Sequence, residues 1–211
     1  MQSFSKNSLA RGDARRIKIA FILPAMNPGG AERVLITVMN NLDRRKFDIS
    51  FICLGHSGPV SAWIDNDIDV HILGKGGVMK SLPALRRKMA ALRLDCVFTT
   101  MTHVNVGLLL LKPFFRNVRF IVRESSQPRA IIHRYGLKNK IFYLAYKYLY
   151  PRADIVLVPS KVIQQELGDM GAKTDNCRLL YNPVDAEKIR AKLTQRDYGS
   201  PKGEPLRFVC V

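Results

Sequence analysis

Short apolar segments alternate with amphipathic segments along almost the whole chain, and this alternation restricts the fold more than any other feature. Seven segments have the length and composition of buried strands: residues 17–23, 47–54, 69–73, 95–100, 118–123, 154–160 and 178–181. Helical spacing of apolar residues occurs between them, at 31–42, 82–94, 104–111, 137–150, 161–170 and 186–193. Such alternation predicts an α/β fold, with a Rossmann-like, mostly parallel sheet and helices on both of its faces.

Local residues predict where two of these helices begin. Pro83 suits a first helical position and Ser81 can cap the helix, so we expect the helix of residues 82–94 to begin there. Asp185 is a good N-cap for the helix of residues 186–193.

The composition also predicts domain boundaries. Residues 1–14 are polar, and we expect a disordered tail; residues 15–194 are expected to form the Rossmann-like domain. Residues 195–205 contain Gly, Pro and charged residues and indicate a linker. Residues 206–211 again have the composition of a strand, with no helix after it, so we expect the first strand of a truncated second domain.

Charge and cysteine usage indicate the kind of partner and compartment. The 211 residues include 34 Lys and Arg against 17 Asp and Glu, a formal net charge of +17, which favours nucleic acid, phosphorylated ligands or anionic membranes. A generally basic surface without such a partner would have the same charge balance, and this alternative stays open. Cys53, Cys96, Cys177 and Cys210 are widely separated, so neither a metal site nor a disulfide framework is predicted. No segment reaches the roughly 20 apolar residues of a membrane helix. We therefore expect a reduced protein in the cytoplasm.

Two glycines, Gly29 and Gly30, stand between the first predicted strand and the first predicted helix. Glycines at this turn let the backbone approach a ligand, and the N-terminus of the helix offers unpaired N–H groups to a phosphate. A tight turn that needs glycine only for its geometry would have the same sequence, and both interpretations stay open. Neither the GxGxxG fingerprint nor a P-loop is present.

Polar residues follow the fourth and fifth predicted strands. His103 and Asn105 come after the segment 95–100, while Arg123 and Glu124 come at the end of the segment 118–123. Because ligands of open parallel sheets bind beyond the carboxyl ends of the strands, these four residues are predicted to face one cleft with the glycine turn. A lone histidine is also common as a surface or helix-capping residue, and this alternative stays open.

Two basic segments are candidates for contact with an anionic partner. Arg86, Arg87, Lys88 and Arg93 lie on the polar face of the predicted helix 82–94, and residues 129–152 interleave basic and aromatic residues. This pattern suits an anionic membrane surface and also nucleic acid, and a solvated helix face would show it too. No nucleic-acid-binding module is recognisable, so we expect no nucleic-acid partner.

Five motifs, in this order along the chain, resemble the N-terminal domain of family-four glycosyltransferases, which are retaining enzymes of GT-B fold. The motifs are Gly29-Gly30-Ala31-Glu32-Arg33, Thr102-His103-Val104-Asn105, Arg123-Glu124-Ser125, Val158-Pro159-Ser160 and Tyr181-Asn182-Pro183-Val184-Asp185. The resemblance implies an N-terminal, acceptor-binding domain. The enzyme would transfer a sugar from a nucleotide-diphosphate sugar to a lipid-linked or polysaccharide acceptor, with neither metal nor other cofactor.

The resemblance also implies roles for the candidate residues. Gly29 and Gly30 come near the donor diphosphate, His103 and Asn105 contact the acceptor or the transferred sugar, and Arg123 and Glu124 line the acceptor cleft. None of them is implied to be the catalytic acid or base. From the basic segments described above, we expect the protein to be peripheral on the inner face of the membrane, with Arg86, Arg87, Lys88 and Arg93 toward the lipid.

One departure from the family concerns the donor-binding half, of which only residues 206–211 are expected here. We therefore expect the chain by itself to be inactive, with a separate C-terminal domain chain as a partner. An alternative is a non-catalytic fragment of a split or truncated gene that binds acceptor or membrane. A Rossmann oxidoreductase is a weaker alternative, because GxGxxG is absent.

Overall fold

The computed structural model describes residues 15–134, 139–172, 175–184 and 190–191. The predicted tail of residues 1–14, the linker 195–205, the strand 206–211 and the cap Asp185 all lie outside the described residues.

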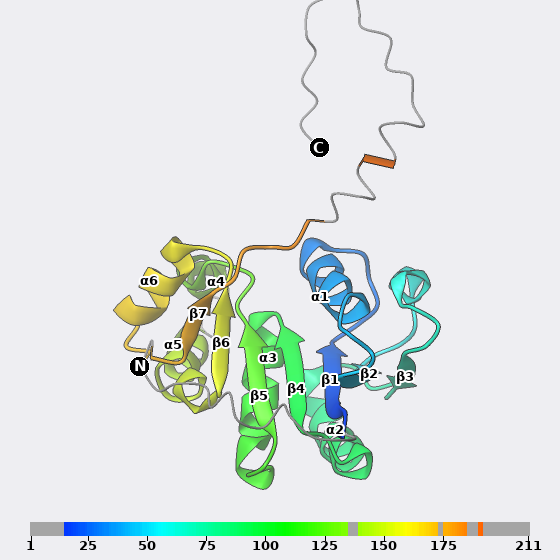
Figure 1. The fold of residues 1–211 in the computed structure, drawn as a ribbon. Helices are drawn as coiled ribbons and strands as arrows, with labels where there is room; N and C mark the ends of the chain where they lie inside the picture. Colours follow the sequence, from blue (N-terminus) through cyan, green and yellow to red (C-terminus); the bar gives the residue numbers. More distant parts are fainter. Residues whose placement is uncertain (1–14, 135–138, 173–174, 185–189, 192–211) are drawn as a thin grey trace, which may run out of the picture.

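Parallel strands form one sheet through the described part of the chain, as the sequence predicts (Figure 1). The strands are β1 (Ile17–Leu23), β2 (Phe47–Cys53), β3 (Asp69–Ile72), β4 (Cys96–Thr100), β5 (Arg119–Arg123), β6 (Ile155–Val158) and β7 (Cys177–Leu179). Their order is β3-β2-β1-β4-β5-β6-β7, so the direction of strand addition reverses between β1 and β4. Phe21 of β1 lies beside Phe51 of β2 and Phe98 of β4, and these side chains fill the centre of the sheet.

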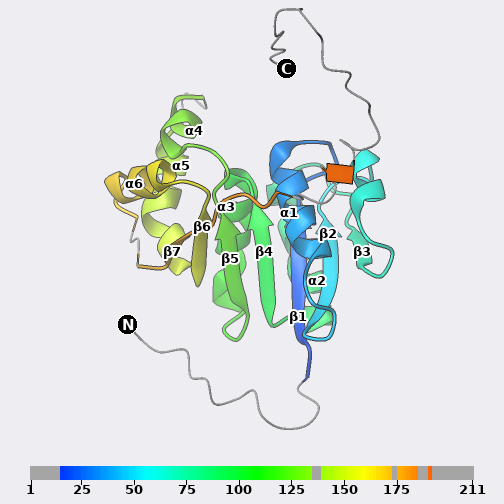
Figure 2. The same cartoon turned by 45° about the horizontal axis from the view of Figure 1, so that its top comes forward.

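Helices cover both faces of the sheet, and each face has its own core (Figures 1 and 2). On one face, α1 (Gly30–Asn40) packs Leu35 and Met39 against Phe21 and Leu23 of β1. On the other face lie α2 (Val78–Leu92), α3 (Thr102–Leu111), α5 (Asn139–Tyr148) and α6 (Lys161–Asp169). Successive residues of β1 therefore point to opposite layers, as the two-residue period of a strand requires.

Short elements complete the connections. The helix α4 (Pro128–Arg134) follows β5, and three 3₁₀ segments occur at η2 (Pro59–Trp63), η3 (Lys112–Phe114) and η5 (Tyr150–Arg152). The sequence pattern predicted one helix at residues 137–150 and did not predict α4 before it. Pro128 at its first position is the kind of start signal that would have revealed it.

The predicted start of the second helix is wrong. The helix α2 begins at Val78, Pro83 lies inside it, and the Ser81 hydroxyl donates a hydrogen bond to the Gly77 carbonyl, 2.8 Å away, instead of capping an N-terminus. Gly77 has φ 93°, a left-handed conformation that favours glycine, and the helix that follows this turn begins four residues before the predicted start at residue 82. Val78 packs against the core beside α3, so tertiary contact outweighs the local signal of Pro83.

Candidate functional site

Three neighbouring strand ends bring the predicted residues to one edge of the sheet. Gly29 and Gly30 follow β1, His103 follows β4, and Glu124 follows β5, and these strands are parallel neighbours in the order β1-β4-β5. In Figure 1 this is the edge toward which the strand arrows point. It includes the reversal between β1 and β4, where open α/β sheets bind ligands.

The two glycines of the first turn have different surroundings. Gly29 is extended, with φ −166°, and a Cβ built on it would stand 2.3 Å from Oε2 at the flexible end of the Glu32 side chain, so the Glu32 carboxylate lies against this turn. Gly30 begins α1, and a Cβ there would meet nothing within 4 Å. No side chain caps this helix. The backbone at Gly30 is therefore open to a ligand, while Glu32 already places a carboxylate beside the same helix end.

A polar hollow of about 160 Å³ opens at the ends of β4 and β5. Its walls come from the start of α3, the β5–α4 loop, α4 and α5, and its lining residues are Met101, Thr102, His103, Ser125, Ser126, Ile131 and Phe142. His103 is exposed at the mouth, and desolvation lowers the pKa of its imidazole below the ordinary value of 6.5. The ring is therefore neutral at neutral pH and can both donate and accept a hydrogen bond.

Backbone strain occurs at the same hollow. Met101 connects β4 to α3 with φ 75°, in the left-handed region that a side chain such as methionine rarely adopts. The N–H groups of Val104 and Asn105 both bond to its carbonyl, at 3.0 and 2.9 Å. Strain of this kind persists where the surroundings fix the backbone, and it is common at ligand sites.

Glu124 lies fully buried beneath this hollow, and both of its carboxylate oxygens are occupied. Oε1 accepts from the Thr102 hydroxyl at 2.8 Å and from the N–H groups of Ser125 and Ser126 at 3.1 and 3.3 Å. Oε2 accepts from the hydroxyls of Tyr150 and Tyr146. Burial raises the pKa of Glu124, although these donors oppose the shift. Glu124 thus ties the loop wall of the hollow to α3, α5 and η5.

Asn105 and Arg123 are also buried. The Asn105 amide donates to the Arg123 carbonyl at 2.9 Å and to the Tyr150 hydroxyl at 3.1 Å. The Arg123 guanidinium, 4% exposed, donates to the Thr100 hydroxyl at 3.2 Å and to the Asn182 side-chain oxygen. Desolvation lowers the pKa of Arg123, and nearby Glu124 opposes this shift.

Of the four residues predicted to face the cleft, only His103 lines the hollow in the described structure. Asn105, Arg123 and Glu124 lie below it as its support, and their contact with an acceptor stays a prediction. Sequence reasoning did not connect Tyr146 and Tyr150 with this site. Their spacing of four places both on one face of a helical turn, but only the fold shows that this face meets Glu124.

The predicted membrane-facing residues lie outside the lining of this hollow, in α2 and at Arg93, which directly follows α2. Arg86, Arg87 and Arg93 are exposed and Lys88 is half-buried, and the Arg86 guanidinium lies 4.0 Å above the ring of Phe114. Their contact with lipid stays a prediction. None of the helices in the described ranges has both the length and the apolar character needed to span a bilayer.

Comparisons with known proteins show the family of this chain. The profile of Glycosyltransferase Family 4 matches residues 28–188. A curated relative from Campylobacter jejuni is 25% identical over 187 residues, which cover 83% of this chain and 50% of the relative. It is the N-acetylgalactosamine-N,N'-diacetylbacillosaminyl-diphospho-undecaprenol 4-alpha-N-acetylgalactosaminyltransferase.

Solved structures of GT-B glycosyltransferases have the same fold. HepE of Anabaena, in complex with UDP-glucose, superposes with a TM-score of 0.65 at 15% identity, over 85% of this chain and 50% of HepE. The lipopolysaccharide outer core galactosyltransferase WaaB gives a TM-score of 0.58 at 17% identity, over 80% of this chain and 46% of WaaB. The chain spans about half the length of these relatives. With the fold of a GT-B N-terminal domain and a family profile that matches most of its length, this chain belongs to glycosyltransferase family 4.

Proposed function

We propose that this chain forms the acceptor side of a glycosyltransferase that moves a sugar from a nucleotide-diphosphate sugar to a hydroxyl of a lipid-linked or polysaccharide acceptor. The observation that carries the proposal is the edge formed by β1, β4 and β5, where the open backbone at Gly30 and the polar hollow at His103 follow neighbouring strands. The name of the Campylobacter relative describes transfer to a sugar carried on diphospho-undecaprenol, which supports an acceptor of this class.

The hollow suits the binding of a sugar hydroxyl. The neutral His103 ring can accept or donate a hydrogen bond, and Ser125 and Ser126 add hydroxyl groups to the same wall. Glu124 fixes the backbone of both serines, so these groups keep their positions when the acceptor arrives. Holding the acceptor hydroxyl toward the donor lowers the entropic part of the barrier, and this is the contribution to catalysis that we propose for the hollow.

The donor diphosphate would approach the N-terminus of α1 at Gly30, where the helix offers N–H groups and a partial positive charge. We further propose that the protein works at the anionic inner face of the membrane, with Arg86, Arg87, Lys88 and Arg93 of α2 toward the lipid headgroups. The exposure of three of these cations and the net charge of +17 support this placement.

Calorimetric titration with a soluble acceptor analogue tests the acceptor site. The probe is a short-chain isoprenoid diphosphate that carries an N-acetylhexosamine disaccharide. His103→Ala should weaken its binding about three- to ten-fold, the loss expected for one hydrogen bond. His56→Ala is the matched control, because His56 is exposed and lies outside the hollow. This variant should bind the analogue with the affinity of the wild type. Equal affinities of the His103→Ala variant and the wild type would contradict the proposed site.

A further inference from the structure

The helix α5 exposes large apolar side chains on its outer face. Ile141, Leu144 and Tyr148 are 60%, 49% and 56% exposed. Their spacing of three and four residues places them in one stripe along the helix. Tyr146, on the opposite face of the same helix, is fully buried, and Ala145 beside the stripe is buried as well. The stripe is therefore additional to the apolar face that α5 needs for its own packing.

Lysines accompany this stripe. Lys140 and Lys147 are both exposed. Each residue of an α-helix is turned by about 100° from the one before it, which places both lysines between Tyr143 and Leu144 around the helix, beside the stripe. Neither lysine forms an ion pair with any residue that the structure describes. The sequence from 125 to 153 contains no Asp or Glu at all, so the segment that includes α5 carries only positive side-chain charge.

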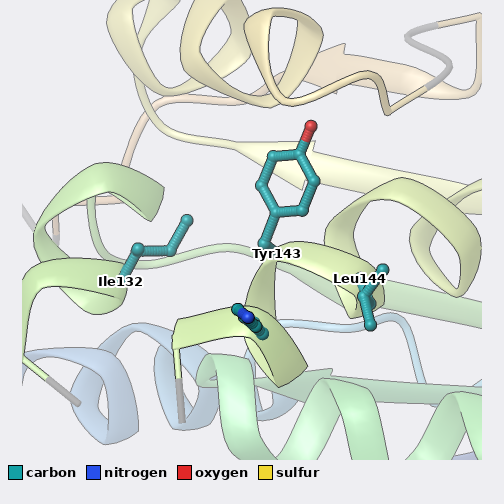
Figure 3. Close-up of a pocket in the computed structure, with 4 residues that line it drawn as sticks. Ile132, Tyr143 and Leu144 are labelled. Carbon is teal, nitrogen blue, oxygen red and sulfur yellow. The ribbon is translucent and has the colours of Figure 1, made fainter. Parts of the chain in front are cut away.

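An apolar hollow of about 330 Å³ adjoins the stripe. Figure 3 shows Ile132 of α4 and Tyr143 and Leu144 of α5 around it, and Lys140 is its remaining lining residue. The hollow is open to solvent on the outer side of the two helices. An apolar depression bordered by a lysine suits aliphatic chains beneath anionic headgroups.

We propose that the outer face of α5, defined by Lys140, Ile141, Leu144, Lys147 and Tyr148, docks on an anionic lipid bilayer. The three apolar side chains enter the boundary between headgroups and acyl chains, and the two lysines extend to the lipid phosphates. Charge complementarity favours this occupant over a second copy of the chain, because each copy carries a net charge of +17 and would bring like charges together.

The same helices connect this surface to the polar hollow. On α4, Ile131 lines the polar hollow and Ile132 the apolar one; on α5, Phe142 and Tyr143 are divided in the same way. A bilayer against α5 would therefore contact one of the helices that form the walls of the polar hollow. The delivery of a lipid-linked acceptor from the bilayer to the polar hollow rests on the proposed function. Docking of α5 on the bilayer requires neither donor nor acceptor.

Vesicle co-sedimentation of the full chain tests the docking surface. Vesicles of phosphatidylglycerol mixed with phosphatidylcholine should bind the protein, and binding should weaken with salt. The Ile141→Ser/Leu144→Ser/Tyr148→Ser variant should bind at least about ten-fold more weakly at low and at high salt, because it removes buried apolar area. The Lys140→Gln/Lys147→Gln variant should lose about five-fold for each lysine at low salt, and little at high salt.

Matched controls on α6 separate this surface from general exposure. Val162 is 53% exposed and Lys161 is exposed, so Val162→Ser and Lys161→Gln should bind vesicles like the wild type. All of these positions are exposed, and thermal melts should show that every variant is folded. Arg86→Gln/Arg87→Gln/Lys88→Gln tests α2 independently, so its result bears on the proposed placement of α2 and not on α5.

Three results would overturn the docking surface. One is that both α5 variants bind the anionic vesicles as tightly as the wild-type chain does. Another is failure of the wild-type chain to bind the anionic vesicles. The third is a lipid-free dimer in analytical ultracentrifugation that the apolar α5 variant abolishes, which would assign the stripe to a second copy. The vesicle assay contains neither nucleotide sugar nor acceptor. Its result therefore does not depend on whether the transferase proposal is correct, and the two proposals can fail separately.

Discussion

Glu124 shows at the scale of one residue how the fold builds the hollow. Its carboxylate accepts hydrogen bonds from Thr102, from two backbone N–H groups and from two tyrosines, yet it has no exposed surface. Desolvation is the larger influence and raises its pKa above the ordinary value of 4.5. The folded protein therefore binds this proton more tightly than the unfolded chain.

The pH dependence of stability follows from this difference in pKa. The stabilisation from the Glu124 proton is fully present below the unfolded pKa and is lost as the pH rises through the higher folded pKa. Glu124→Gln removes this titration while it keeps an oxygen for Thr102. The free energy of unfolding of Glu124→Gln, relative to the wild type, should therefore increase as the pH rises from 4.5. Urea denaturation of both proteins at acidic and alkaline pH measures the difference, and a difference that is constant with pH would refute the assigned shift.

At the scale of elements, the sheet and the start of α6 were predictable from the sequence, and the start of α2 was not. Buried parallel strands such as β1 and β4 consist of apolar runs, which the sequence displays directly. The start of α2 depends instead on the left-handed turn at Gly77 and on packing of Val78 against α3. A local sequence pattern contains no information about such long-range contacts, so Pro83 and Ser81 predicted the wrong start for α2.

The contact between α2 and α3 gives a prediction for Gly107. A Cβ at this position would stand 2.4 Å from Cγ1 of Val78, whose branched side chain has little freedom to move. Alanine favours a helix over glycine by about 1 kcal/mol, but overpacking costs typically about 1–3 kcal/mol. Gly107→Ala should therefore lower the free energy of unfolding by about 1 kcal/mol.

Val78→Ala is the partner substitution for this test, because it removes the methyl group that a side chain at position 107 would strike. The double variant should lose less stability than the sum of the two single losses, as chemical denaturation of all four proteins would show. Stabilisation by Gly107→Ala alone would mean that α2 and α3 are not packed this closely.

The whole molecule arranges its candidate surfaces by topology. Strand order places the Gly30 backbone and the His103 hollow on one edge, while α2, α3 and α5 share one face of the sheet. The sequence predicted this common edge, because ligand residues of parallel sheets follow the strand ends. It could not predict that Asn105, Arg123 and Glu124 are buried under the hollow, since burial depends on Tyr146, Tyr150 and Asn182 from distant segments.

Amide chemical-shift mapping tests the central claim most directly, that this edge is the acceptor side of a glycosyltransferase. The isotope-labelled chain would be titrated with the short-chain isoprenoid diphosphate that carries an N-acetylhexosamine disaccharide. We predict the largest shifts at the walls of the hollow, at Thr102, His103, Ser125 and Ser126. Shifts concentrated at the opposite edge, around Lys46 before β2 and Asp95 before β4, would contradict the account, as would the absence of any shift.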